Sequence, residues 1–454
     1  MVKLYFHGAA RSVTGANYLL EIGDETNKTK ILVDCGMSQG SRMAEKENYE
    51  NFPYDPKEIR ALLVTHAHID HTGRIPKIYR DGFRGKIYGT PPTLDFAKLL
   101  LLDSEHIIKD EAEKQGIKQL YTIEDIEAAS ELFEGIDYHK KFEIGPGITA
   151  EFLDAGHILG SSIIKIKAED KTIVFSGDLG NPPTPLLRPT EFVDRADYVI
   201  IESAYGDRLH ESREERKEIL KDTIEDTIGN GGVMMIPAFA IERTQELLFE
   251  LNDLVEHHRI PAIPVFLDSP LAIKATAIYQ KYPEYYNKEA AYLIKSSDDI
   301  FKFPNLKFTL TVEDSKKIND IPAPKIVIAG SGMSTAGRIL HHEQRNLSDP
   351  KSTLLIIGYQ AKGSMGRRIL DGEKEVRIFG ETVPVRCRAK AIGGYSAHAD
   401  QAKLKDWINR IKRPIKKVFV VQGEETAEMA LQNIIRKESV IDAEAPKMGD
   451  VFEL

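Results

Sequence analysis

Short apolar runs bounded by Gly, Asn or Asp recur in the N-terminal part of the chain, a pattern typical of β-strands. Apolar residues three and four positions apart predict helices at residues 93–115 and 123–134. This part of the chain is therefore expected to be a strand-rich domain. Its strands are expected at residues 4–10, 18–22, 30–34, 61–65, 162–167, 172–175 and 198–201.

From about residue 209 onward, predicted helices and strands alternate. Because parallel strands need crossover helices between them, this alternation predicts a parallel sheet and a second, α/β domain. The expected elements are a charged helix at 211–228, the strand 233–237, a helix from 242, the strand 263–267, a helix from 269, and the strands 325–329 and 353–358, each leading into a helix.

The C-terminal segment is predicted to contain the strand 385–391, the helix 400–411, the strand 417–421 and the helix 425–437. These elements are too few to bury a core of their own, although the whole chain of 454 residues exceeds what one core usually supports. We therefore expect this segment to complete the first domain, which makes the second domain an insertion.

The composition is that of an ordinary globular protein, with 42% apolar and 29% charged residues. The longest apolar stretch, at 233–241, has about nine residues, whereas a membrane-spanning helix needs about 20. The N-terminus lacks the apolar run of a secretion signal. Cys35 and Cys387 lack CxxC spacing and fit two free thiols in a reducing compartment. These features predict a cytoplasmic protein with no membrane segment.

The net charge of −9 does not by itself favour a nucleic-acid partner, because phosphate binding relies on Lys and Arg. Net charge does not fix local charge, however, and a metal site supplies cations where an anionic substrate binds. The composition therefore leaves the substrate open.

Residues 65–71 read Thr-His-Ala-His-Ile-Asp-His and directly follow an apolar run. His66 and His68 lie two positions apart on an extended segment, so their side chains point to one face. Asp70 and His71 follow where a helix is expected to begin. Imidazole and carboxylate are the ligands that zinc takes in catalytic sites, and four such side chains within six residues suit two neighbouring cations.

Further ligands are expected after other strands. His157 and Asp178 each follow a glycine at the end of a strand-like run. The glycines let the backbone approach the metals closely, and Asp178 can bridge two cations with its two oxygens. Asp34, which follows another apolar run, is expected to orient a ligand histidine without binding metal itself.

Together these residues resemble the ligand set of the metallo-β-lactamase superfamily, in their order along the chain and in their positions at strand ends. The resemblance implies two Zn²⁺ ions, with Asp34 behind the ligands. The implied ligands are His66, His68, Asp70, His71, His157 and Asp178.

Other segments resemble the β-CASP branch of this superfamily, whose members are nucleases that process nucleic acids. The likeness is to compact bacterial and archaeal RNases related to the cleavage-factor endonuclease of mRNA 3′ processing. It implies an α/β fold with an αββα sandwich at 1–208 and 393–454, an inserted β-CASP domain at 209–392, and an active site between the two domains. The matching segments are 202–206, 237–246, 268–272, 330–338, 358–360 and 395–400.

The resemblance implies a zinc-dependent ribonuclease that cuts RNA internally, from the 5′ end, or in both ways. A metal-bound hydroxide would attack the phosphate, with Asp70 and Asp178 as catalytic carboxylates. His398, held by Glu202, would protonate the leaving ribose oxygen as the general acid.

The substrate phosphates are expected to meet the amide-rich start of a helix, which is a natural anion site. An RNA substrate and a homodimer are the partners that the resemblance implies. The expected contacts are Ser331, Gly332, Met333, Arg338, Ser396 and Arg243.

One position departs from the pattern. In RNA nucleases of this branch a histidine that ligates the second metal follows a strand and precedes Gly-Glu, whereas here Gln422 stands in that place. Neutral glutamine is a poor zinc ligand. We therefore expect the second site to be weak or empty and catalysis to be slower.

Three other functions stay open. DNA-directed members of the branch also lack this histidine, so a DNA nuclease is one alternative. The second is an RNA-binding subunit with weakened catalysis, against which the intact ligand set counts. The third is a small-molecule metallohydrolase, such as a thioesterase or lactamase, against which the long insertion and the pair of Glu202 and His398 count.

Overall fold

The computed structural model describes residues 1–24, 27–40, 42–210, 213–295, 299–358, 360, 363–392, 395–412 and 414–454. The described chain divides into two compact units. Unit 1 comprises Met1–Pro182, Pro189–Leu209 and His398–Leu454, and unit 2 comprises Pro183–Arg188 and His210–Ala397. The residues from His398 onward therefore belong to the N-terminal unit, as an insertion requires. The strand expected at 385–391 does not: it forms Arg388–Ala391, which pairs with Thr353–Ile356 in the sheet of unit 2. The boundaries expected from the sequence stay predictions, and Gly393 lies outside the described residues.

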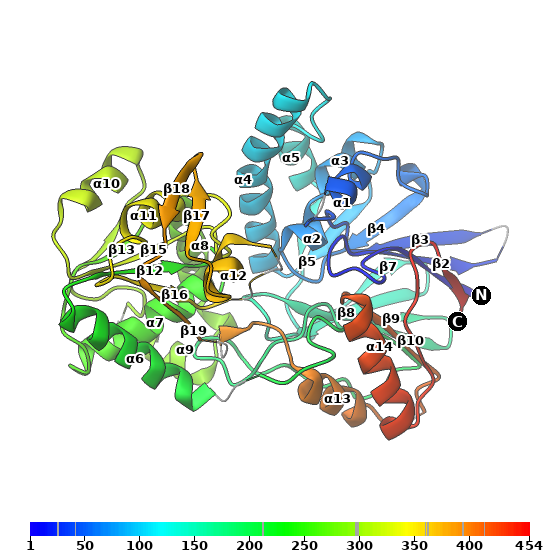
Figure 1. Ribbon diagram of the computed structural model, residues 1–454. Coiled ribbons are helices and arrows are strands. Elements are labelled where there is room, and N and C mark those ends of the chain that lie inside the picture. Colours follow the sequence, from blue (N-terminus) through cyan, green and yellow to red (C-terminus); the bar gives the residue numbers. More distant parts are fainter. Residues whose placement is uncertain are drawn as a thin grey trace. The chain divides into compact units, whose positions relative to one another are not determined.

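The strands described in unit 1 form two mixed sheets (Figure 1). The first has the order β22 (Val451–Glu453), β1 (Val2–Gly8), β2 (Asn17–Gly23), β3 (Lys28–Val33), β4 (Ile59–Leu63), β5 (Lys86–Gly89) and β6 (Phe133–Gly135). The second has the order β21 (Ala443–Glu444), β20 (Lys417–Val421), β11 (Tyr198–Glu202), β10 (Lys171–Phe175), β9 (Ser162–Ala168), β8 (Ile148–Asp154) and β7 (Lys141–Gly145).

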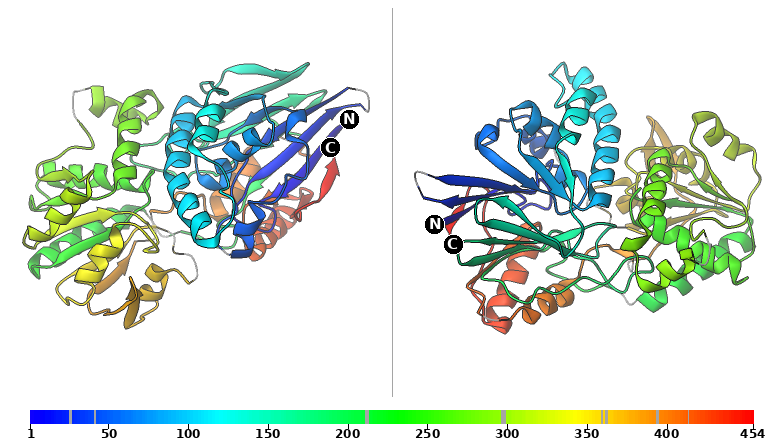
Figure 2. Two further views of the ribbon diagram at one scale, coloured as in Figure 1. Left: turned by 90° about the horizontal axis from the view of Figure 1, so that it is seen from above. Right: turned by 180° about the vertical axis from the view of Figure 1, so that it is seen from behind.

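These two sheets are stacked on each other across an aromatic core (Figure 2). The ring centroids of Phe6 in β1 and Phe419 in β20 lie 5.3 Å apart. Those of Tyr18 in β2 and Phe175 in β10 lie 5.9 Å apart. Because successive strand residues point to opposite faces, the alternate residues of the same strands face outward, where helices cover them.

Helices pack on both outer faces of the stacked sheets. Trp407 and Leu431 share a buried cluster with Val199 of the second sheet, and Ile78 shares one with Leu62 of the first. The αββα sandwich expected from the sequence is thereby confirmed. The helices of unit 1 are α1 (Arg42–Glu47), η1 (Pro56–Glu58), α2 (Ile69–Thr72), α3 (Ile75–Arg80), α4 (Pro91–Gln115), α5 (Ile123–Ser130), α13 (Gln401–Arg410), α14 (Glu425–Ile434) and η5 (Ile435–Ser439).

The helix expected at 123–134 is shorter than predicted. Helix α5 ends at Ser130, and β6 pairs with β5 from Phe133 onward. A strand of three residues is too short to show an alternating pattern, so its pairing with β5, and not its local sequence, decides its structure.

Unit 2 has the α/β organisation that the alternating pattern predicts. Its described strands form a parallel sheet in the order β14 (Leu306–Phe308), β13 (Val265–Leu267), β15 (Lys325–Ala329), β12 (Val233–Pro237), β16 (Thr353–Ile356) and β19 (Arg388–Ala391), beside the hairpin of β17 (Glu375–Ile378) and β18 (Glu381–Pro384). Its helices are α6 (Arg213–Gly229), α7 (Arg243–Glu256), α8 (Pro270–Lys281), η2 (Pro283–Tyr285), α9 (Lys288–Lys295), α10 (Val312–Lys317), η3 (Ile318–Asp320), α11 (Ile339–Asn346) and α12 (Met365–Leu370).

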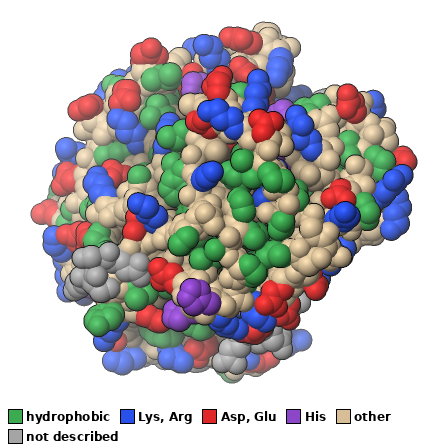
Figure 3. Space-filling model, turned by 90° about the vertical axis from the view of Figure 1, so that its left-hand side faces the viewer, with side chains coloured by type: hydrophobic (Ala, Val, Ile, Leu, Met, Phe, Trp, Pro, Cys, Tyr) green, Lys and Arg blue, Asp and Glu red, His purple; other side chains and the backbone are tan. Residues whose placement is uncertain are grey.

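The surface carries charges of both signs. On the face shown in Figure 3, acidic and basic side chains are interspersed around a group of hydrophobic ones. The net charge of −9 therefore does not gather into a single acidic area on this face. Over the described residues, no helix has the length and apolar character that crossing a membrane requires.

Candidate metal centre and acid–base pair

The chemistry-bearing side chains of unit 1 lie at the carboxyl ends of its strands. Asp34 follows β3 and the histidine-rich segment follows β4, which runs parallel to β3. Asp178, Glu202 and Gln422 stand at the ends of β10, β11 and β20, which are also parallel to one another. Parallel strands present their carboxyl ends at one edge of a sheet, the usual place for a site in such sheets.

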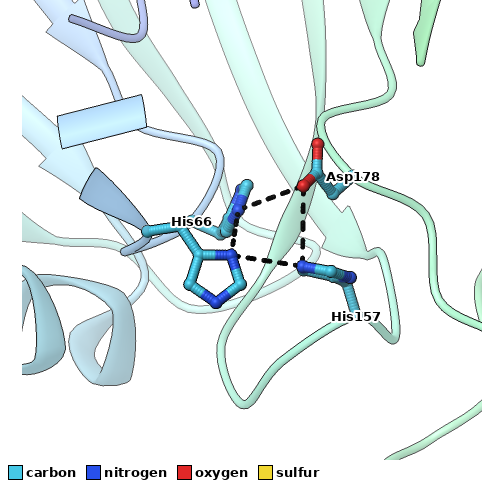
Figure 4. Close-up of side chains that lie close together, drawn as sticks. His66, His157 and Asp178 are labelled. Carbon is cyan, nitrogen blue, oxygen red and sulfur yellow. Dashed lines mark hydrogen bonds and ion pairs between the residues drawn. The ribbon is translucent and has the colours of Figure 1, made fainter. Parts of the chain in front are cut away.

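Among the described residues, three of these side chains converge with His157, which follows β8, and the donor atoms of all four lie within 4.8 Å of one another. They are His66, His68, His157 and Asp178. His68 Nδ1 lies 3.0 Å from His66 Nε2 and 3.3 Å from His157 Nε2. Asp178 Oδ2 lies 3.4 Å and 3.5 Å from the same two Nε2 atoms (Figure 4).

This cluster fits a tetrahedral metal ion. Zinc binds imidazole nitrogen and carboxylate oxygen at about 2.0–2.2 Å, which puts neighbouring ligand atoms of a tetrahedron about 3.3–3.6 Å apart. Three of the spacings, at 3.3, 3.4 and 3.5 Å, match that requirement, and the fourth, between His66 Nε2 and His68 Nδ1, is shorter at 3.0 Å. Burial and the neighbouring His71 hold the pKa of His66 well below its ordinary value. The imidazole of His66 is therefore neutral, as metal binding requires.

Asp34 orients His66, through Thr65, and His71 by hydrogen bonds on the side of each ring that faces away from the site. Its Oδ1 accepts the backbone N–H of Thr65, and its Oδ2 accepts the Thr65 hydroxyl and His71 Nδ1, each at 2.8 Å. Thr65 Oγ1 also lies 3.1 Å from His66 Nδ1. Both imidazoles thus have Nδ1 engaged and Nε2 turned to the site, which is how carboxylates orient ligand histidines.

Sequence reasoning missed Thr65. The signal available was its place between the end of a strand and the first histidine. Gly177 allows a close approach to Thr65 itself: its φ is +54°, and a Cβ there would lie 2.8 Å from Cβ of Thr65. A larger residue would push the end of β10, and with it Asp178, away from the histidines.

A second group of donors adjoins the first. His71 Nε2 lies 3.8 Å from Asp70 Oδ2 and 3.5 Å from Asp178 Oδ1. Gln422 directs its amide Nε2 to two of these atoms, at 2.8 Å from His71 Nε2 and 2.9 Å from Asp178 Oδ1. Gln422 therefore hydrogen-bonds to this donor set.

His398 lies beside the cluster and pairs with Glu202. Its Nδ1 is 3.2 Å from Glu202 Oε2 and 3.8 Å from Asp178 Oδ2. Glu202 is fully buried, and its Oε1 accepts the backbone N–H of Leu179 at 2.6 Å. Burial lowers the pKa of His398, but the carboxylates of Glu202, Asp178 and Asp70 outweigh burial and raise it to about 9. His398 is therefore protonated at neutral pH, and 28% of its side chain is exposed, which leaves it accessible.

The other residues expected to contact substrate all belong to unit 2, and their contacts are described within that unit. Ser331 Oγ accepts the backbone N–H of Thr335 at 3.1 Å. The carbonyls of Gly332 and Met333 accept bonds from the Gln360 amide and the Gly366 N–H. Ser396 is half-buried, and Tyr359, in the motif at 358–360, lies outside the described residues.

Both arginines of this group are bonded within unit 2. Arg338 is 20% exposed, and its Nη1 lies 2.8 Å from Asp268 Oδ1. Arg243 is only 5% exposed, and its Nη1 donates to Glu246 at 2.5 Å and to the carbonyl of Tyr395 at 2.7 Å. Its guanidinium therefore anchors the segment that leads to Ser396.

Three family models match the chain. The model of the metallo-beta-lactamase superfamily matches residues 14–228, that of the Beta-Casp domain residues 244–369, and that of the Zn-dependent metallo-hydrolase RNA specificity domain residues 382–446. A crystal structure of a protein of unknown function from Enterococcus faecalis covers 100% of both chains with a TM-score of 0.55 and 12% identity, a likeness of fold alone.

Curated relatives match over almost the whole chain. Ribonuclease TTHA0252 of Thermus thermophilus is 38% identical over 94% of this chain and 94% of its own. The RNase J-like protein of Methanocaldococcus jannaschii is 33% identical over 100% of both chains. Transcription termination factor FttA of Methanosarcina mazei is 33% identical over 98% of this chain and 70% of its own. With the ligand cluster at its strand ends and an α/β insertion in its sandwich, the chain belongs to the β-CASP branch of the metallo-β-lactamase superfamily.

Proposed function

We propose that the chain is a zinc-dependent ribonuclease that hydrolyses RNA phosphodiester bonds, with His398 as the general acid. The observation that carries this proposal is the four-ligand cluster beside the pair of buried Glu202 and partly exposed His398. Two of the relatives are named ribonuclease or RNase, and an RNA specificity domain matches residues 382–446, which supports RNA as the substrate.

Zinc is the metal that we propose for His66, His68, His157 and Asp178, because this mixture of imidazole and carboxylate is typical of catalytic zinc sites. When bound, zinc lowers the pKa of water and draws charge from the scissile phosphate. The second zinc expected from the sequence would need Asp70, His71 and Asp178, the donor set that Gln422 contacts.

His398 supplies the proton that the leaving ribose oxygen needs. Glu202 accepts the Nδ1 hydrogen, and the Nε2 hydrogen is the one that we propose passes to the substrate. Glu202 is kept in place because its other oxygen accepts the Leu179 N–H. The pKa of about 9 keeps His398 protonated at neutral pH and therefore able to act as an acid.

The phosphates flanking the cut are proposed to meet Ser331, Gly332, Met333, Arg338 and Ser396. Of these, Arg338 offers a partly exposed guanidinium already turned by Asp268. We assign Arg243 a positioning role, because its guanidinium is buried against Glu246 and the Tyr395 carbonyl. It would act on substrate through Ser396, which follows Tyr395.

We place the protein in the cytoplasm, because both of its cysteines, Cys35 and Cys387, are buried free thiols, as a reducing compartment allows. A homodimer is proposed from the family resemblance alone, and light scattering on the purified chain tests it.

The function is tested with a 5′-labelled RNA and a DNA of the same sequence, each with and without a chelator. RNA cleavage that stops with the chelator, and that His157→Ala abolishes, is expected. The matched control is His106→Ala, which removes an exposed histidine of α4 and should leave cleavage unchanged. Fragment lengths separate internal cuts from 5′ cuts.

Other outcomes would contradict the proposal. Preferential cutting of DNA would make the chain a DNA nuclease, the candidate that Gln422 favours by standing where a histidine is expected. Tight RNA binding without cleavage would make it an RNA-binding subunit. Turnover of ester or lactam substrates, with RNA left intact, would make it a small-molecule hydrolase.

A further inference from the structure

We propose that each active site of this chain holds one metal ion, because the amide of Gln422 engages the lone pairs that a second ion would need. The inference rests on the proposed function for the first position, at His66, His68, His157 and Asp178. It concerns the second donor set, where the residues present do not fit a metal.

The spacing of the second donor set is not what excludes an ion. His71 Nε2 lies 3.5 Å from Asp178 Oδ1 and 3.8 Å from Asp70 Oδ2. Metal bonds of about 2.0–2.2 Å would span these separations. The obstacle is the Gln422 nitrogen, at 2.8 Å from His71 Nε2 and 2.9 Å from Asp178 Oδ1.

Burial lowers the pKa of His71, but Asp178, Asp34 and Asp70 outweigh burial and raise that pKa well above its ordinary value. A second ion would need the neutral ring. In the neutral ring His71 Nδ1, which faces the carboxylate of Asp34 at 2.8 Å, carries the hydrogen, so Nε2 has a single lone pair to offer. Asp178 Oδ1 is also an acceptor. An amide NH₂ has two hydrogens, one for each of these atoms, whereas the opposite amide orientation would set oxygen against two acceptors.

The surrounding structure also holds Gln422 in its contact with His71 and Asp178. It is 4% exposed, its φ is +51°, and its backbone N–H donates to the carbonyl of Ala9 at 2.8 Å. The next residue, Gly423, packs so closely that an added Cβ would lie 2.3 Å from Ser203 Oγ. Moving the amide aside would break its hydrogen bonds to His71 Nε2 and Asp178 Oδ1 in a buried site, which is costly.

The same contact orients Asp178 for the first position. With Oδ1 bonded to Gln422, Oδ2 is the oxygen that faces His66 and His157, at 3.4 Å and 3.5 Å. Gln422 is therefore a positioning residue for the first metal as well as the reason for the absence of a second. Gln422→Ala should weaken zinc binding at the first position, measured by competition with a chromophoric chelator.

The test is the number of zinc ions per chain, measured by native mass spectrometry after loading with excess zinc and desalting. The wild type should hold one, and Gln422→His should hold two, because histidine adds a ligand and tolerates a positive φ better than most residues. Gln432→His is the matched control, since Gln432 is a buried glutamine of unit 1 whose amide donates to the Ala443 carbonyl, and it should keep one ion.

The outcomes separate this inference from the proposed function. A wild-type chain that holds no zinc would contradict the proposed metal site at the first position. Two ions in the wild type, or one in both the wild type and Gln422→His, would overturn the role of Gln422 and leave the first position standing. A second readout needs no variant: the wild type loaded with two equivalents of Co²⁺ should give the electron paramagnetic resonance of an isolated ion, and a spin-coupled pair would contradict the proposal.

Discussion

The acid role of His398 depends on Glu202, and Glu202→Gln tests that dependence. Glutamine has almost the same shape and keeps a carbonyl oxygen for the Leu179 N–H, so the fold should be unchanged. The substitution removes the negative charge that contributes most to raising the pKa of His398 to about 9.

The size of the effect follows from the protonated fraction of His398. At about pH 7.5, an imidazole with a pKa of about 9 is about 97% protonated, and one with the ordinary pKa of about 6.5 is about 9% protonated. A return to the ordinary pKa therefore lowers the amount of acid, and kcat, about tenfold, which corresponds to about 1.4 kcal/mol in activation free energy. Because the rate falls where the acid loses its proton, the alkaline limb of the pH profile should move from near pH 9 towards neutrality.

The assay is kcat for cleavage of a labelled RNA, measured across the pH range for both proteins at equal zinc content. The control is Asp253→Asn, which removes a carboxylate beside His257, an exposed histidine of unit 2, and should leave the profile where it is. An alkaline limb that does not move in Glu202→Gln would refute the assignment of His398 as the acid.

Three further predictions follow from the same contacts. His68→Ala should lower zinc affinity by more than the roughly 10–100-fold typical of losing an outer-shell partner, as a chelator competition would show. Asp34→Asn should lower the free energy of unfolding of unit 1 by about 2–6 kcal/mol in urea, because its new NH₂ group cannot accept from Thr65 Oγ1 and His71 Nδ1; a change below about 1 kcal/mol would contradict this. Burial raises the pKa of Glu343 to about 8, so the folded state keeps a proton that the unfolded chain releases at about pH 4.5. The free energy of unfolding should therefore fall by a few kcal/mol as pH rises from about 4.5 to about 8. Glu343→Gln should remove this dependence on pH, and hydrogen exchange within unit 2 would measure it.

The sequence predicts the sandwich and most strand positions well because the apolar runs are strong and local. The strands at 233–237 and 325–329 have the bounds expected. His66, His157 and Asp178 each come after a strand, which the sequence shows. The strands before His157 and Asp178, β8 and β10, run in the same direction because both are antiparallel to β9 between them, so their carboxyl ends share an edge. The strand before His66, β4, belongs to the other sheet, so its approach depends on how the two sheets stack. The three-residue strand β6 lacks any such local pattern.

Side-chain partners are harder to predict, because they depend on residues far apart in the chain. Gln422 and His71 are separated by 351 positions, so the sequence shows that a ligand is missing but not that an amide binds in its place. The sequence likewise suggests Arg338 as a phosphate contact but does not show that Asp268 already pairs with its guanidinium. A charged residue in a motif shows what it can bind but not what it already pairs with.

The central claim is that zinc held by His66, His68, His157 and Asp178 makes this chain cut RNA, and a zinc titration of the metal-free protein tests it most directly. Cleavage of a labelled RNA should be absent at first, rise in proportion to added zinc, and level off at one equivalent per chain. Cleavage that does not change with zinc, or that is absent at every zinc concentration, would contradict the account.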